Sequence, residues 1–205
     1  MMRLFFAPGC PFAHRTRAML TRLGQPFEPR EYDPSNKPAE LLALSPIAAS
    51  PLLDDDGFVL SESAVINEYL AEKLTWRDAF AADAQLRARQ RLSMKRFDEV
   101  VVPAAYASFK DPSTLEAKPM WRKDLEHLET TVKQSAPESL LGLHLAPHTM
   151  RWEWAFGENQ LVRELGRICG DFLAAATSLP CVVATSPQRE AITVLLRKRF
   201  GPPAP

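Results

Sequence analysis

The sequence predicts a chain of two parts: a small α/β domain over residues 1–74 and an all-α domain over residues 84–205, joined by a linker at residues 75–83. Three observations predict this class of fold. Strand and helix signals alternate in the first part, the second part shows only helical periodicity, and a cysteine followed by a proline stands where the first strand gives way to the first helix. At 205 residues, 46% of them hydrophobic, the chain is long enough for one large domain or two small ones.

Turn residues divide the first part into short segments. Gly24 ends the first helix as a C-terminal cap, and Pro29 places the second strand near a sheet edge. The tight turn at residues 54–57 joins a hairpin. The expected order is strand, helix, strand, helical turn, strand, strand and helix, at residues 4–7, 12–23, 27–32, 40–44, 52–53, 58–60 and 61–74. This order suits an α/β sandwich with one hairpin at its edge.

The second part looks entirely helical. Residues 84–110 form one long helical pattern, strained at Pro103. Pro137 ends a second helix, Ser186 and Pro187 begin the last one, and the tail from Gly201 is expected to be disordered. Apolar residues at helical spacing mark the three later helices: Leu125, Leu128 and Val132; Leu161, Leu165, Ile168 and Phe172; and Ile192, Leu195, Leu196 and Phe200.

Charge and cysteine content narrow the classes of function. Lys plus Arg equals Asp plus Glu, 25 against 25, so no net field steers the chain toward nucleic acid or membrane. The apolar runs are too short to cross a bilayer, and the start shows no signal-peptide pattern. The chain has three cysteines, an odd number, and no two of them form a Cys-x-x-Cys pair: Cys10, Cys169 and Cys181. A cytoplasmic protein without a disulfide framework is therefore expected.

The histidines do not predict a metal site. His144 and His148 have i,i+4 spacing, but Pro147 lies between them and no carboxylate or cysteine is close in sequence. We expect both to be solvated or at the edge of the core, and we expect no bound metal. The basic run at residues 87–96 is followed directly by Asp98 and Glu99, which favours a solvated helix face over a nucleic-acid patch.

Cys10 is the strongest candidate for chemistry. Pro11 suits the first turn of a helix, where its missing N–H costs nothing, so Cys10 is expected at the helix N-cap. Free backbone N–H groups and the positive end of the helix dipole favour thiolate over thiol there. The pattern therefore indicates a nucleophile or a redox thiol, with a buried structural cysteine as the alternative.

Other local features can cooperate with Cys10. Glu62 and Ser63 begin a helix, whose N-terminus makes a site for a carboxylate, although a serine there is equally a simple helix cap. A cis peptide before Pro51 would expose the backbone of Ser50 to an extended ligand. Lys37 can pair with a ligand carboxylate or remain a free surface lysine. His14, one turn after Cys10, can tune the thiolate, but a solvated position is favoured.

Assembled in this order, the motifs resemble the cytosolic glutathione transferase superfamily, which joins a thioredoxin-like domain to a helical bundle. The cysteine-containing start is similar to the omega class, whose catalytic group is cysteine. The resemblance covers residues 2–74 well and beyond them is mainly one of architecture. It rests on Cys10-Pro11-Phe12-Ala13-His14-Arg15, Asn36-Lys37-Pro38, Ser50-Pro51 and residues 61–70.

The resemblance implies a set of roles. Cys10 would be the thiol that pairs with glutathione, and the chain would form a homodimer through the α/β domain of one subunit and the helical domain of the other. It implies a glutathione site made by Phe12, Lys37 for the glycine carboxylate, the Ser50 backbone for the cysteinyl part, the cis residue Pro51, and Glu62 with Ser63 for the γ-glutamyl end. The activity expected is glutathione-dependent thiol transfer or reduction through a mixed disulfide on Cys10, with weak conjugation.

The same stretch also resembles stringent starvation protein A, a glutathione-transferase-like protein that associates with bacterial RNA polymerase. A non-catalytic regulator of that kind is the alternative. That family typically carries Phe-Pro-His-Pro where this chain has residues 74–77. Two further departures concern the glutathione transferases themselves: Ser50 stands where valine is common, and Gly142 stands where the capping box at Ser139 usually has aspartate.

Overall fold

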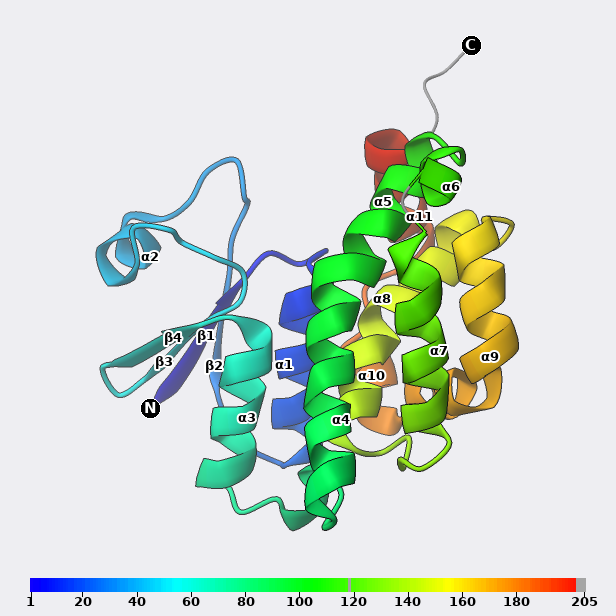
Figure 1. The fold of residues 1–205 in the computed structure, drawn as a ribbon. Helices are drawn as coiled ribbons and strands as arrows, with labels where there is room; N and C mark the ends of the chain where they lie inside the picture. Colours follow the sequence, from blue (N-terminus) through cyan, green and yellow to red (C-terminus); the bar gives the residue numbers. More distant parts are fainter. Residues whose placement is uncertain (118, 202–205) are drawn as a thin grey trace. The chain divides into compact units, whose positions relative to one another are not determined.

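The computed structural model describes residues 1–117 and 119–201 of the chain (Figure 1). The chain divides into two compact units: unit 1 comprises Met1–Arg77 with Pro180–Pro187, and unit 2 comprises Asp78–Leu179 with the residues from Gln188 onward. The predicted ranges divide the chain near the same place, but the short segment 180–187 packs with unit 1. The part of the expected disordered tail beyond Gly201 lies outside the described residues.

Unit 1 is an α/β domain around a four-stranded mixed sheet with strand order β2-β1-β3-β4. β2 is parallel to β1, whereas β3 runs antiparallel to both β1 and β4. α1 and α3 cover one face of this sheet, and α2 lies on the other side (Figure 1). The elements are β1 (Met2–Phe6), α1 (Pro11–Arg22), β2 (Glu28–Glu31), α2 (Ala39–Leu44), β3 (Leu52–Asp55), β4 (Phe58–Ser61), α3 (Ser63–Lys73) and α10 (Pro180–Ala184). The predicted α/β class and element order are confirmed.

The turns of unit 1 follow from residues that tolerate positive φ. Gly24 has φ +60 directly after the C-cap of α1, as predicted for a helix-ending glycine. Asp56 and Gly57 both have positive φ, which matches a two-residue turn between antiparallel strands. The Asp54 carboxylate accepts a hydrogen bond from the Gly57 N–H at 2.8 Å and closes this turn. β3 and β4 therefore form the predicted hairpin.

Unit 2 is helical throughout its described residues, and α8 is its most buried helix. Every residue from Leu140 to Trp152 is buried, which is expected of a helix surrounded by others. A short 3₁₀ turn, Arg77–Ala79, spans the boundary between the units in sequence. The helices of unit 2 are α4 (Ala84–Arg96), a π-helical segment (Phe97–Val101), α5 (Val102–Lys110), α6 (Thr114–Ala117), α7 (Met120–Val132), α8 (Leu140–Phe156), α9 (Gln160–Thr177) and α11 (Arg189–Phe200).

The predicted long helix over residues 84–110 contains the π-helical segment just before Pro103. A proline has no N–H to donate, and its ring collides with the carbonyl four residues earlier in a regular α-helix. The wider π turn ends at Val101, two residues before Pro103, and Pro103 takes a first-turn position in α5 where no N–H is needed. The strain expected at Pro103 is thus accommodated by a local change of helix type.

The expectation for His144 and His148 was wrong. Both imidazoles are fully buried in α8, and His144 Nε2 lies 3.1 Å from a carboxylate oxygen of Asp98. The ring of Phe97 meets both imidazoles edge-on, at centroid distances of 6.3 and 5.9 Å. Pro147, which lies between them in sequence, stands inside α8, and the helix continues through it. Both histidines are therefore core residues of unit 2.

Gly142 explains why the usual capping-box residue is missing at the start of α8. Ser139 is the N-cap, but its side chain makes no capping hydrogen bond. A Cβ atom built on Gly142 would lie 1.8 Å from the carbonyl oxygen of Pro137. The chain before the helix therefore passes too close to position 142 for any side chain, and a glycine fits there.

Candidate active site around Cys10

Cys10 lies where the sequence placed it, between β1 and α1. Its N–H donates to the Ala7 carbonyl at 3.0 Å, and its own carbonyl accepts from the His14 N–H at 3.1 Å. Cys10 has extended backbone angles and is the N-cap of α1, with Pro11 at the first helical position. Its side chain is partly exposed. A residue at this position lies beside the unpaired N–H groups of the first helical turn, although the Cys10 side chain makes no capping hydrogen bond.

Ser50 makes two contacts at the same place. Its carbonyl oxygen accepts a hydrogen bond from Cys10 Sγ at 3.3 Å, and its Oγ accepts one from the Ala7 N–H at 3.0 Å. The Ser50–Pro51 peptide bond is cis, as predicted. Two hydrogen bonds of Ser50 therefore join the loop before β3 to the turn before α1, one at Ala7 and one at the Cys10 thiol.

Glu62 and Ser63 form the N-terminus of α3, as predicted. Glu62 is the N-cap and has φ +68, an uncommon conformation for a residue with a side chain, and it is exposed. Ser63 is buried, and its Oγ lies 3.5 Å from the Arg15 guanidinium. That guanidinium also lies over the Phe12 ring, 4.9 Å from its centroid. Arg15, which sequence reasoning did not single out, thus joins two predicted site residues from α1 and α3.

Lys37 lies on the exposed loop before α2. Its ammonium group donates to the carbonyl of Ile47 at 3.3 Å. Ile47 belongs to the same loop as Ser50, so Lys37 is tied to the segment that contacts Cys10. The predicted site residues are thus connected in three places. Cys10 contacts Ser50, and Lys37 contacts the loop that leads to Ser50. Arg15 lies between Phe12 and Ser63.

Tyr32 is a neighbour of Cys10 that sequence reasoning missed. Its hydroxyl lies 3.4 Å from the carbonyl oxygens of both Ala48 and Ala49. Burial raises the pKa of Tyr32 above its ordinary value; a hydrogen bond with Ser50 acts in the opposite direction, and the charge of Cys10 raises it further. The sequence signal that could have indicated this contact is a tyrosine hydroxyl at the last position of the strand predicted over residues 27–32.

The expectation of a solvated His14 was wrong. The imidazole is buried, and its Nε2 lies 3.0 Å from the carbonyl oxygen of Val182 in α10. Because that partner is a hydrogen-bond acceptor, the proton belongs on Nε2. His14 therefore ties α1 to α10 inside unit 1.

The other two cysteines are not suited to nucleophilic chemistry. Both are buried. Burial raises the pKa of Cys169 to about 12, with a further contribution from the charge of Glu129 and an opposing one from Lys133. Burial also raises the pKa of Cys181. Of the three cysteines, Cys10 alone combines exposure with a helix N-terminus.

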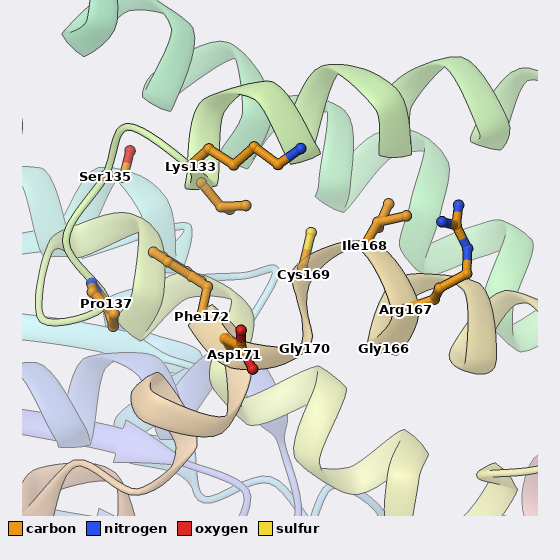
Figure 2. A pocket seen from close by; sticks show the side chains of 11 residues that line it. Lys133, Ser135, Pro137, Gly166, Arg167, Ile168, Cys169, Gly170, Asp171 and Phe172 are labelled. Carbon is orange, nitrogen blue, oxygen red and sulfur yellow. The ribbon is translucent and has the colours of Figure 1, made fainter.

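A separate pocket of about 450 Å³ lies in unit 2, between the end of α7 and α9. Figure 2 shows the thiol of Cys169 pointing from α9 toward α7, with Lys133 and Arg167 at the edges. None of the predicted site residues lines this pocket, and its thiol is held protonated by burial. It is thus not the site that the sequence predicted.

Within residues 1–117 and 119–201, no helix combines the length and apolar character needed to cross a bilayer. The same residues hold no group of three or more His, Cys, Asp or Glu side chains arranged to bind a metal ion.

A thioredoxin-like sheet with a cysteine at the first helix N-cap, followed in the chain by a helical bundle, is the architecture of the glutathione transferases. Comparison with known proteins agrees: the family "Glutathione S-transferase, N-terminal domain" matches residues 4–75. This segment belongs to that family, and the resemblance stated from the sequence is confirmed.

Among characterised proteins, glutathione S-transferase omega-1 of Mus musculus is 31% identical over 127 residues, 62% of this chain and 52% of the mouse protein. A stringent starvation protein A homolog of Haemophilus ducreyi is 30% identical over 118 residues, 58% of this chain and 55% of that protein. The chain thus spans about half the length of these two relatives.

Among solved structures, glutathione transferase Omega 2C of Trametes versicolor superposes with a TM-score of 0.80 at 20% sequence identity. The match covers 97% of this chain and 98% of that one. At this level of identity the likeness shows the fold alone.

Proposed function

We propose that this protein is a glutathione-dependent thiol transferase or reductase that acts through a glutathione mixed disulfide on Cys10. The observation that supports this most is the placement of the Cys10 thiol, partly exposed at the N-terminus of α1. A helix N-terminus stabilises a thiolate, which is both the attacking and the leaving form in thiol–disulfide exchange.

Glutathione binds along the surface of unit 1 in this proposal. The γ-glutamyl carboxylate meets the free N–H groups of α3 and the Ser63 hydroxyl, while the Glu62 carboxylate accepts from the γ-glutamyl amine. Lys37 pairs with the glycine carboxylate. The main chain of Ser50 beside the cis residue Pro51 binds the cysteinyl part, and the Phe12 ring lies against the Arg15 guanidinium next to Ser63.

The reaction proceeds in two exchange steps. The Cys10 thiolate attacks the glutathione sulfur of a mixed disulfide R–S–S–G, forming Cys10–S–S–G and releasing R–S⁻, which takes up a proton. A second glutathione thiolate then attacks the glutathione sulfur of Cys10–S–S–G, forming G–S–S–G and regenerating the Cys10 thiolate. The substrate disulfide is reduced by two electrons and the two glutathiones are joined by oxidation, so no metal or further cofactor enters.

The residue at position 13 supports the use of a second glutathione. Ala13 stands three residues after Cys10, at the position where a Cys-x-x-Cys motif would have its resolving cysteine. Conjugation of electrophiles is expected to be weak, because glutathione must then be the nucleophile and a second thiolate beside it competes with it and repels it. Small glutathionyl mixed disulfides and dehydroascorbate are the substrates that the resemblance favours.

Intact-mass spectrometry after treatment with oxidised glutathione tests this function, between pH 5 and pH 9, with Cys10→Ser as the control. We expect one glutathione adduct to form rapidly even at low pH, to be absent in the variant and to be removed by reduced glutathione. No adduct, or an adduct only at alkaline pH, would refute the mechanism.

The similarity to stringent starvation protein A supports one alternative, a non-catalytic regulator that binds RNA polymerase. The two functions separate in a pull-down with purified bacterial RNA polymerase. Retention of the Cys10→Ser variant on the polymerase, together with no glutathione adduct on the wild type, would favour the regulator.

We also propose a homodimer formed by the α/β domain of one subunit and the helical domain of the other. Large apolar side chains that are about half exposed support it: Phe58 on β4, Val65 on α3 and Leu92 on α4. Sedimentation velocity of the wild type and of Phe58→Ser tests it. A monomeric wild type at micromolar concentration would rule it out.

A further inference from the structure

The environment of Tyr32 links a small core cluster to the thiol of Cys10. Its ring is buried at the end of β2, where its N–H donates to the Phe6 carbonyl at 3.0 Å. The ring belongs to a cluster that joins the sheet to α2 and to the loop before β3. The buried members of this cluster are Phe5, Tyr32, Leu41, Ala48 and Leu52. The position of the Tyr32 hydroxyl is therefore fixed by packing around the ring.

The loop at residues 45–50 needs such an anchor. Ala48 is buried and has φ +47, a left-handed conformation that residues with a side chain adopt only when their surroundings impose it. A turn bond from the Ala48 N–H to the Ser45 carbonyl, 3.0 Å long, holds one side of this bend. The Tyr32 hydroxyl, 3.4 Å from the Ala48 and Ala49 carbonyl oxygens, holds the other side.

The next residue along the loop meets the nucleophile. Ser50 accepts a hydrogen bond from Cys10 Sγ on its carbonyl oxygen and one from the Ala7 N–H on its Oγ. Two anchors thus place the Ser50 carbonyl beside the thiol: Tyr32 on the preceding two residues and Ala7 on the Ser50 side chain. Both act within unit 1.

We propose that Tyr32 is a positioning residue for Cys10, whose hydroxyl holds residues 48–50 so that the Ser50 main chain stays at the thiol. The effect on glutathione binding rests on the proposed function, because the Ser50 main chain is also where we place the cysteinyl part of glutathione. Tyr32 itself does not touch the reacting sulfur in this account.

The Ser50 carbonyl has a defined chemical effect on Cys10. A carbonyl that accepts from Sγ–H stabilises the protonated thiol and opposes the thiolate. Releasing it lets the thiolate form at lower pH, while it weakens the main-chain site for glutathione. Tyr32 keeps its proton at neutral pH because burial, in spite of Ser50, raises its pKa, so it remains a hydrogen-bond donor.

The other charged or titratable groups near this turn have hydrogen bonds to other segments. His14 and Arg15 follow Cys10 on α1, but their side chains bond to the Val182 carbonyl in α10 and the Ser63 hydroxyl in α3. Lys37 donates to the Ile47 carbonyl in the loop. Because the Tyr32 hydroxyl also interacts with the charge of Cys10, a change in the pH profile of Cys10 on its removal is attributed to the loop where Ser50→Ala, which keeps that hydroxyl, moves the profile in the same direction.

Tyr32→Phe tests the inference because it keeps the ring and removes only the hydroxyl. We expect the pH profile of Cys10 alkylation by iodoacetamide to move to lower pH, with a rate at pH 6 about 2- to 10-fold higher, which corresponds to the loss of one neutral hydrogen bond. We expect glutathione binding, measured by calorimetry, to weaken by a similar factor. Cys169 and Cys181 should stay unlabelled, which separates this effect from unfolding.

Tyr69→Phe is the matched control. Tyr69 donates to the Asp55 carboxylate at the end of β3, so its loss affects stability without touching residues 48–50. If Tyr32→Phe does not fold, Ser50→Ala frees the same loop from Ala7 and is expected to move the profile in the same direction. An unchanged alkylation profile together with unchanged glutathione affinity would overturn the inference. If the wild type forms no glutathione adduct, the proposed function fails, but the alkylation profile still decides the role of Tyr32.

Discussion

Gly142→Ala is the substitution for which the structure and simple helix propensity predict opposite results. Gly142 lies in the first turn of α8, and alanine is a better helix former than glycine by about 0.5–1 kcal/mol. The new Cβ, however, would lie 1.8 Å from the Pro137 carbonyl oxygen and 2.8 Å from its carbon. Backbone atoms cannot rotate away, so the chain at Pro137 or the start of α8 must shift.

The clash is expected to outweigh the gain in propensity. Overpacking in a well-packed core costs about 1–3 kcal/mol. Because α8 is buried on all sides, its displacement also disturbs packing around Leu141 and Leu145. The expected net loss in the free energy of unfolding is about 1–2 kcal/mol, which corresponds to a fall in melting temperature of about 2–8 °C.

Two other glycines provide matched controls for this measurement. Gly166 and Gly170 lie inside α9, and a Cβ built on either meets no atom within 4 Å. Each alanine variant there should gain about 0.5–1 kcal/mol. Urea denaturation followed by far-ultraviolet circular dichroism compares the three variants. A Gly142→Ala protein as stable as the wild type would show that the approach of Pro137 to α8 is wrong.

Four further predictions concern single residues. Asp55→Asn should destabilise the protein at neutral pH. Burial acts to raise the pKa of Asp55, but the hydrogen bonds from Lys73 and Tyr69 outweigh burial and hold this pKa below its ordinary value. A group with a lowered folded pKa contributes stability that is lost as pH falls, so urea titrations should show the gap to the variant closing below about pH 4. Asn67→Leu should raise the free energy of unfolding by about 1–3 kcal/mol, because neither amide atom of this buried residue has a hydrogen-bond partner among residues 1–117 and 119–201. Asn159→Leu removes the N-cap of α9 and should lower the free energy of unfolding. Urea denaturation that finds Asn67→Leu less stable than Asn159→Leu would contradict both predictions. Iodoacetamide at pH 7.5 should add one group to the native protein, at Cys10, and three after denaturation, since burial raises the pKa of Cys169 to about 12; native labelling of Cys169, read by peptide mass, would refute this.

The features that could be predicted from the sequence are those set by local chemistry. Pro11 fixes its own φ at the start of α1, and Gly24 permits the positive φ that ends the helix, so both ends of α1 were predictable. The same holds for the Asp56-Gly57 turn. The apolar spacing in α7, α9 and α11 predicted helices because each has one buried face and one exposed face.

The features that were missed depend on contacts between distant segments. From Leu140 to Trp152 α8 has no exposed face because other helices surround it, so its periodicity is weak and its bounds were not predicted. His14 looked like a surface residue because its partner, Val182, is 168 positions away. Tyr32 meets Ala48 and Ala49 only when the loop has folded back over the sheet. Glu62 and Ser63 were placed correctly at a helix start, but Arg15 behind Ser63 was not foreseen.

The bond between His14 and Val182 delays the completion of unit 1 while the protein is being synthesised. α1 leaves the ribosome early, but the segment 180–187 that completes unit 1 is made 110 residues after Arg77, the difference between positions 187 and 77. At about 5–20 residues per second, translation needs roughly 5–22 s to cover that distance. During this interval the α1 face that α10 will cover has no native cover from its own chain. A nascent chain stalled between these two points should therefore be a target for chaperones, and the thiol of Cys10 should be present before its domain is finished.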